Sequence, residues 1–150
     1  MEAEEYLTEI LKLSEEDIKH VLDNIGANPA AFENMMATMA RDGTSVQDFV
    51  ALKLKRATAN LTAFQHQHIL KALNEHPEGV SAAYFNKMKS EGVDLSNPKA
   101  VGVAMKDSNA LTYRIELDKY VMLSRSHEVA LRTYEPILNN LSWSRLFSFW

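Results

Sequence analysis

The chain has 150 residues, of which 46% are hydrophobic and 24% are charged, and its formal net charge is −4. This suits one globular domain or two very small ones, and it counts against the basic field that most nucleic-acid-binding domains carry. The absence of cysteine excludes disulfides and thiolate metal sites, so we expect an intracellular protein, in a compartment that the sequence does not specify. No apolar run approaches the roughly 20 residues that would span a bilayer, and the acidic N-terminus lacks the apolar segment of a signal peptide.

Residues 1–60 are predicted to form a helical bundle, because apolar side chains recur there at the spacing of one helix face. Helix starts are marked by Ser14, by Asn28 followed by Pro29, and by Ser45. Ser and Asn side chains can accept hydrogen bonds from the free N–H groups of a first turn, and Pro has no N–H there to leave unsatisfied. The predicted helices lie over residues 2–13, between residues 14 and 26, between residues 28 and 42, and over residues 46–59.

Residues 61–125 are predicted to form a winged helix-turn-helix. A junction at residues 60–62 precedes it, and because this junction is not a Gly/Ser/Pro linker, the two parts should pack together. Helical spacing predicts helices that begin near residues 62, 80 and 97. After residue 109 the apolar period changes from 3.6 to 2, which predicts a hairpin with Leu111, Tyr113 and Ile115 alternating along its first strand.

Residues 126–150 are predicted to begin as a helix, capped by Ser124 or Ser126, and to end in a strongly apolar tail. The hairpin predicted after residue 109 would be only marginally stable alone, so it should lie against the helices of residues 61–109. The predicted fold class is therefore mainly α with a small β-hairpin: a helical bundle packed on a winged helix-turn-helix, followed by a C-terminal helix.

One sequence step resembles a known family. Gly26-Ala27-Asn28-Pro29, within LSEEDIKHVLDNIGANPAAFENMM, joins two predicted helices. It resembles the G-G-N/H-P signature in the helical lid of archaeal-type and STAND-like P-loop (AAA+) ATPases, where such a lid commonly leads into a winged-helix domain. The resemblance spans about residues 14–134. It implies a lid-like N-terminal subdomain, with Asn28 or Pro29 close to nucleotide if an ATPase core is present.

The chain itself lacks the chemistry of such an ATPase. It contains no G-x-x-x-x-G-K-[ST] loop to cradle phosphates and no strand ending in paired acidic residues to hold Mg²⁺. We therefore predict that the chain alone binds no nucleotide or other cofactor. If the resemblance holds, the chain is the C-terminal part of such an ATPase or a product that has lost the nucleotide-binding core.

No catalytic or metal-binding constellation stands out in the sequence. His66 and His68 are two positions apart, so on a helix they point in different directions and could not share one metal ion. No G-x-S-x-G motif marks a nucleophile, and the early carboxylates are explained as partners of a helix dipole. We therefore predict a non-enzymatic protein without a metal site.

The leading hypothesis is a non-catalytic interaction or regulatory module that acts through protein contacts. Its partner would be a nucleotide-binding core or a second copy of the chain. The third helix of the winged helix is apolar in its middle, so it favours a packing surface, and the apolar tail must pack back on the helices or form an interface. The candidate interface residues are Val101, Gly102, Trp143, Phe147, Phe149 and Trp150.

Two alternatives remain open. A winged helix could bind DNA or RNA through its third helix and wing, but the local charge sum there is only +2, after subtraction of Asp107, Glu116 and Asp118. The weaker alternative is an assembling structural protein of a virus or mobile element. The candidate nucleic-acid contacts are Lys99, Lys106, Arg114, Lys119 and Arg125.

Overall fold

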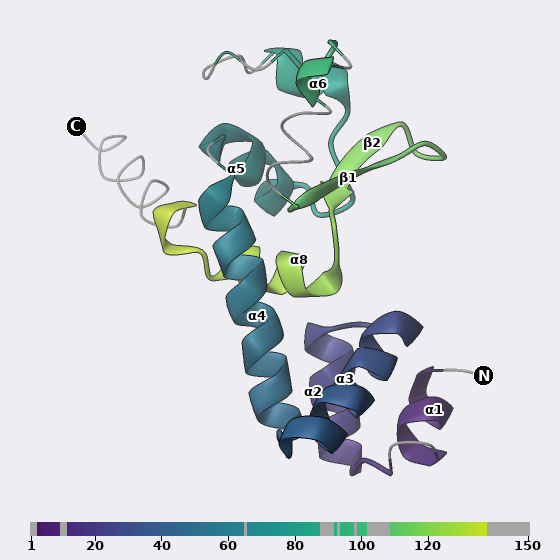
Figure 1. The fold of residues 1–150 in the computed structure, drawn as a ribbon. Coiled ribbons are helices and arrows are strands. Elements are labelled where there is room, and N and C mark those ends of the chain that lie inside the picture. Colours follow the sequence, from purple (N-terminus) through teal and green to yellow (C-terminus); the bar gives the residue numbers. More distant parts are fainter. Residues whose placement is uncertain are drawn as a thin grey trace, which may run out of the picture.

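A computed structural model of the chain describes residues 3–9, 12–64, 66–87, 92, 94–97, 99–101 and 109–137. The described part is mainly helical with one small antiparallel hairpin and a helix after it, which confirms the predicted fold class (Figure 1). None of its helices is long and apolar enough to cross a membrane. The helices are α1 (Ala3–Glu9), α2 (Glu15–Asn24), α3 (Pro29–Asp42), α4 (Val46–Ala63), α5 (Gln67–Glu75), α6 (Ala82–Lys87) and α8 (Arg125–Arg132), and the strands are β1 (Leu111–Arg114) and β2 (Lys119–Met122).

The bundle consists of α1, α2, α3 and the first half of α4. The predicted caps are confirmed: Ser14 Oγ accepts from the Asp17 N–H, and Ser45 Oγ accepts from the Asp48 N–H. Asn28 Oδ1 accepts from both Ala30 and Ala31 at the start of α3. The core of the bundle is formed by Leu7, Ile18, Val21, Ile25, Phe32, Met35, Val46, Phe49 and Val50.

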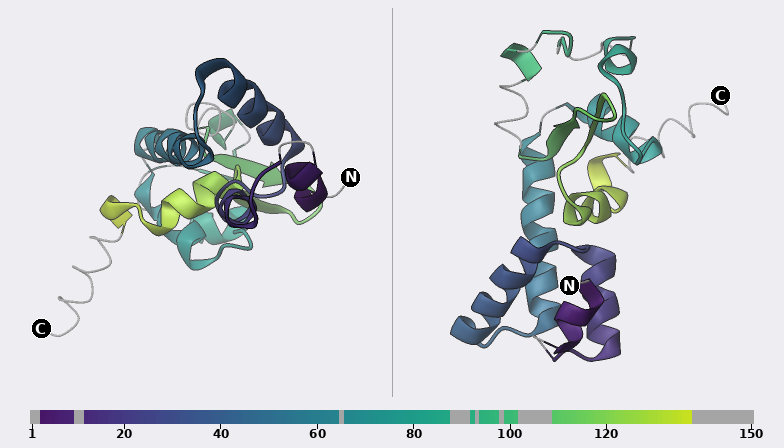
Figure 2. Two further views of the ribbon diagram at one scale, coloured as in Figure 1. Left: turned by 90° about the horizontal axis from the view of Figure 1, so that it is seen from below. Right: turned by 90° about the vertical axis from the view of Figure 1, so that its right-hand side faces the viewer.

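Helix α4 is longer than predicted. The sequence predicted an end at residue 59 and a junction at residues 60–62, but α4 runs without interruption from Val46 to Ala63. The reason is tertiary: Ala57 and Leu61 are buried in the core of the winged-helix region, whereas Phe49 is buried in the bundle. Helix α4 therefore serves both cores and crosses the predicted boundary between them (Figures 1 and 2).

The winged-helix region follows the order helix, bridge, helix, helix, hairpin. After α5, Val80 forms an isolated antiparallel bridge with Tyr120 of β2, with N–H···O distances of 2.9 and 2.8 Å. Helix α6 comes next, and then a helical stretch at residues 99–101, whose Lys99 N–H is capped by Asn97 Oδ1. Strands β1 and β2 pair from Leu111↔Met122 to Arg114↔Lys119.

Helix α8 closes the structure by packing along α4 and reaching the bundle (Figure 1). Ser124 or Ser126 was predicted to cap it, and the cap is Ser124, whose Oγ accepts from the His127 N–H at 3.4 Å. The Arg125 Nε donates to the Asp23 carbonyl at 3.0 Å, and the Ser126 Oγ donates to the Asn24 carbonyl at 3.2 Å. The end of α2 and the start of α8 are thus joined directly, next to the shared helix α4.

Candidate functional site

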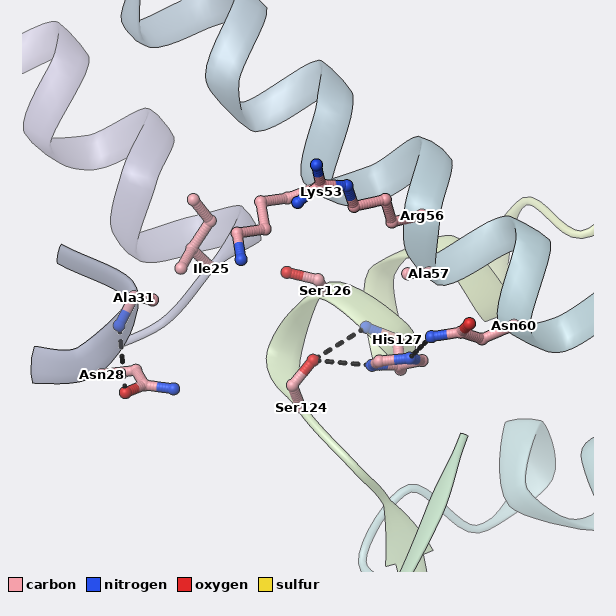
Figure 3. Close-up of a pocket in the computed structure, with 10 residues that line it drawn as sticks. All are labelled: Ile25, Asn28, Ala31, Lys53, Arg56, Ala57, Asn60, Ser124, Ser126 and His127. Carbon is pink, nitrogen blue, oxygen red and sulfur yellow. Dashed lines mark hydrogen bonds between the residues drawn. The ribbon is translucent and has the colours of Figure 1, made fainter. Parts of the chain in front are cut away.

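A pocket lies where the bundle meets the winged-helix region. Its walls come from the α2–α3 connection, from the middle of α4 and from the first turn of α8, and it has a volume of about 230 Å³ (Figure 3). Because α8 closes the pocket by packing on both α4 and the end of α2, the pocket is a product of the tertiary fold. The lining residues are Ile25, Asn28, Ala31, Lys53, Arg56, Ala57, Asn60, Ser124, Ser126 and His127.

The pocket is electrostatically positive. Lys53 and Arg56 lie on successive turns of α4, and no carboxylate is among the described residues that line the pocket. Neither cation forms an ion pair with any described residue. Burial lowers the pKa of the Lys53 ammonium, and the neighbouring charge of Arg56 lowers it further.

His127 links α8 to α4 on one side of the pocket. Its Nε2 lies 3.1 Å from the Asn60 amide nitrogen, which is also 3.5 Å from the Asn109 carbonyl oxygen. That second contact orients the amide with its N–H groups toward the ring, so His127 Nε2 is the acceptor and Nδ1 carries the hydrogen. The Nδ1–H then donates to Ser124 Oγ at 2.7 Å. Burial lowers the pKa of His127, which favours this neutral form.

The contact between Ser124 and His127 has the distance of a nucleophile–base pair but not its chemistry. A general base must accept the hydroxyl proton, and in this arrangement Nδ1 already carries a hydrogen. Ser124 Oγ also accepts the His127 N–H as the cap of α8. The described residues contain no group of three or more His, Cys, Asp or Glu that could hold a metal ion. The features that the pocket does present are its two cations and the hydrogen-bonding groups of α8.

The two residues predicted to lie near nucleotide face different hollows. Asn28 caps α3 and lines the positive pocket. Pro29, the first residue of α3, lines a separate groove of about 380 Å³ with Ala3, Tyr6, Ala27 and Phe32. The rings of Tyr6 and Phe32 are stacked there, with centroids 5.8 Å apart. The groove is apolar, in contrast to the pocket.

The predicted nucleic-acid residues do not form one free basic surface. The Arg114 Nε donates to Glu116 at 2.6 Å, and Arg125 is bonded to the Asp23 carbonyl and to Glu128. Lys99 is exposed, whereas Lys119 is partly buried and lies opposite Arg114 in the hairpin. Lys106 lies outside the described residues.

The predicted protein interface needs one correction. Val101 has only 7% of its surface exposed and belongs to the core of the winged-helix region, so its side chain packs within the chain and is not free to contact a partner. The other predicted interface residues lie outside the described residues: Gly102, Trp143, Phe147, Phe149 and Trp150.

The structure instead exposes apolar side chains at the tip of the wing, which the sequence reasoning missed. Ile115 was predicted to continue the alternation of the first strand, but β1 ends at Arg114 and Ile115 enters the turn. Ile115 is 83% exposed and Leu117 is 49% exposed, and we call these two residues the wing tip. The signal in the sequence is Asp118, because Asp tolerates the left-handed conformation of a turn, and it adopts a φ of 50°.

Comparisons of this chain with the models of protein families, with curated proteins and with solved structures find no match. The resemblance to the lid and winged-helix part of a P-loop ATPase thus rests on the residues of this chain.

Proposed function

We propose that the chain is a non-catalytic interaction module that binds a protein partner through its wing. In keeping with the resemblance to the lid and winged-helix part of a P-loop ATPase, the partner is a P-loop nucleotide-binding core. The observation that carries the proposal is the exposure of Ile115 and Leu117 at the wing tip, beside the 38% exposed Tyr113. Large apolar side chains gathered on one projecting hairpin are typical of a protein contact.

The charges around the wing tip support protein contact over nucleic-acid contact. Arg114 is paired with Glu116, and the Tyr113 hydroxyl donates to Asp118. A wing that binds nucleic acid would need free cations for the phosphates. Here Arg114 is paired with Glu116, and Lys119 is balanced in number by Asp118, so the hairpin carries no net positive charge and the apolar groups project beyond it.

Affinity purification from the natural host, followed by quantitative mass spectrometry, tests the proposal. The double variant Ile115→Ser/Leu117→Ser should lower recovery of a protein with a G-x-x-x-x-G-K-[ST] sequence at least tenfold, because both apolar anchors are lost. The matched control is Leu123→Ser, since Leu123 directly follows β2, away from the wing tip, and is about as exposed as Leu117. Equal recovery with the double variant and the control would contradict the proposal, as would failure of any P-loop protein to co-purify with the unaltered chain.

Binding to duplex DNA and to RNA, titrated over a range of salt concentrations, provides the opposing measurement. Phosphate contacts produce a steep loss of affinity as salt rises. If the chain binds with such a slope, and Lys99→Glu combined with Lys119→Glu abolishes binding, the wing is a nucleic-acid contact and the protein-contact proposal is wrong.

A further inference from the structure

We propose that the positive pocket between the α2–α3 connection, α4 and α8 binds a small phosphate-bearing ligand, with the phosphate group between Lys53, Arg56 and the first turn of α8. This site is separate from the wing tip and does not depend on the protein contact proposed above. Two cations line this concave site, hydrogen-bond donors of α8 lie beside them, and the space suits a small ligand.

Lys53 and Arg56 form the cationic side of the pocket. Lys53 and Arg56 are three positions apart on α4, so their side chains emerge from the same face and both line the pocket. Two like charges beside a partly enclosed space repel each other, and the described lining residues supply no carboxylate to offset them. The lowered pKa of Lys53 reports the same situation, with burial as the larger cause and Arg56 as the smaller one. A bound anion would stabilise both cations.

The start of α8 supplies hydrogen-bond donors beside the cations. Ser124 Oγ accepts two hydrogens from His127, from its backbone N–H and from its Nδ1–H, which leaves the Ser124 hydroxyl hydrogen to donate elsewhere. The Ser126 N–H has no hydrogen-bond partner among the described residues, although only 7% of Ser126 is exposed. Ser124 and Ser126 line the pocket together with Lys53 and Arg56, which come from α4 on its other side (Figure 3).

The size and walls of the pocket define the class of ligand. A volume of about 230 Å³ is several times the roughly 30 Å³ that one water molecule occupies in the liquid. It accommodates a phosphate group with a small organic substituent. Ile25, Ala31 and Ala57 provide a short apolar wall beside the cations. The ligand would contact both the bundle and α8, so binding should hold the two regions together.

Two probes test the site by ¹⁵N–¹H correlation spectroscopy of the whole chain: inorganic phosphate and ribose 5-phosphate, titrated at constant ionic strength against sodium chloride. Saturable shifts of the Ser126 and Arg125 amides are expected. Lys53→Gln/Arg56→Gln should weaken binding at least tenfold. Lys55→Gln, which changes an exposed residue of the same helix that does not line the pocket, should leave it unchanged. Tighter binding of ribose 5-phosphate than of phosphate would identify a phosphomonoester as the ligand, and the reverse would identify the free anion.

A second variant tests the site while Lys53 and Arg56 stay in place. Ala31→Glu places a carboxylate on the pocket wall at the third position of α3, where glutamate is favourable for a helix. It should block binding of both probes, whereas Ala31→Gln, of nearly equal size, should retain it.

The proposal is overturned by any of three results. The first is the absence of saturable shifts with both probes. The second is equal weakening in Lys55→Gln and in the double variant. The third is binding of a single-stranded oligonucleotide, with the same amide shifts, while neither small probe binds.

Discussion

The bundle and the winged-helix region are held together in different ways. In the bundle, Ser14, Asn28 and Ser45 each accept hydrogen bonds from residues two or three positions ahead. The winged-helix region also has caps, at Ser81 and Asn97, but His66, which precedes α5, makes no side-chain cap. That region depends in addition on distant pairs such as Val80 with Tyr120, in which the two residues exchange backbone hydrogen bonds. The bundle is therefore encoded mainly by local signals, whereas the winged-helix region also needs its distant pairings, and α4 belongs to both.

The largest effect is expected from Phe49→Ala, which opens the core of the bundle on the shared helix. Phe49 is fully buried, and loss of such a ring costs about 3–5 kcal/mol. Because α4 also carries Leu61 of the other core, we expect one cooperative transition in urea, and hydrogen exchange that quickens in both α2 and α5.

Leu52→Ala is the control for that variant, since Leu52 lies on the same helix and is 37% exposed. It should cost far less. If the α5 amides keep their protection in Phe49→Ala while those of α2 lose it, the two cores unfold separately and α4 does not couple them.

The next effect contrasts two glycines that both adopt positive φ. At Gly79, with φ of 115°, an added Cβ would lie 2.8 Å from Val121 Cγ1 and 3.1 Å from the Tyr120 carbonyl oxygen. Gly79→Ala should therefore cost about 2–4 kcal/mol, from backbone strain and from overpacking beside the Val80–Tyr120 bridge.

Gly43→Ala is the matched variant in the bundle. Gly43 has φ of 65° and no heavy atom within 4 Å of an added Cβ, so only strain of about 1–2 kcal/mol is expected. Chemical denaturation of both variants measures the difference. Equal losses would mean that the close packing around Gly79 contributes nothing, and that the wing is less tightly built than the contacts indicate.

The same contrast explains what the sequence could predict. Caps and helix starts were predicted because a cap depends on residues a few positions apart, and the Asn28 and Ser45 hydrogen bonds confirm them. The predicted end of α4 was wrong. Asn60 and Thr62 are residue types that often interrupt helices, but burial of Leu61 keeps the helix intact. Ile115 was assigned to a strand because alternation continues through it, although the turn had already begun.

The pocket could not be predicted by reasoning of this kind. Asn60 and His127 are 67 positions apart, and neither has a local motif that indicates contact with the other. In the sequence, Lys53 and Arg56 have only the ordinary features of cations in the later part of a helix, where they suit the dipole and face solvent. They line a pocket only because α8 returns to α4 and brings Ser124 and Ser126 with it.

A smaller effect is expected from the caps, which sharpen the contrast between local and distant contacts. Asn28→Ala removes an acceptor that two backbone N–H groups share, and should cost about 1 kcal/mol. Ser81→Ala should cost less, because Ser81 accepts one N–H, from Tyr84, at 3.3 Å, and the six-residue helix α6 is held mainly by burial of Phe85. Thermal unfolding of both variants compares them. Asn28→Gly is the control, with an expected loss of a few tenths of a kcal/mol. A larger loss in Ser81→Ala than in Asn28→Ala would show that the cap of α6 contributes more than the cap of α3.

The smallest effect at neutral pH is expected from His127, at the contact between the two regions. Burial holds its pKa in the folded chain below the ordinary value of 6.5, so the unfolded chain takes up a proton more readily. The contribution of neutral His127 to stability is thus complete above about pH 6.5 and is lost as the pH falls through and below that value. Protonation would also place a cation on Nε2, which now accepts from Asn60, in a pocket that already holds Lys53 and Arg56. We therefore expect the free energy of unfolding, measured in urea from about pH 7.5 to about pH 5.5, to fall more steeply for the unaltered chain than for His127→Gln, because the other histidines titrate in both. Parallel pH profiles would show that the proton on His127 has no influence on how α8 is held against α4.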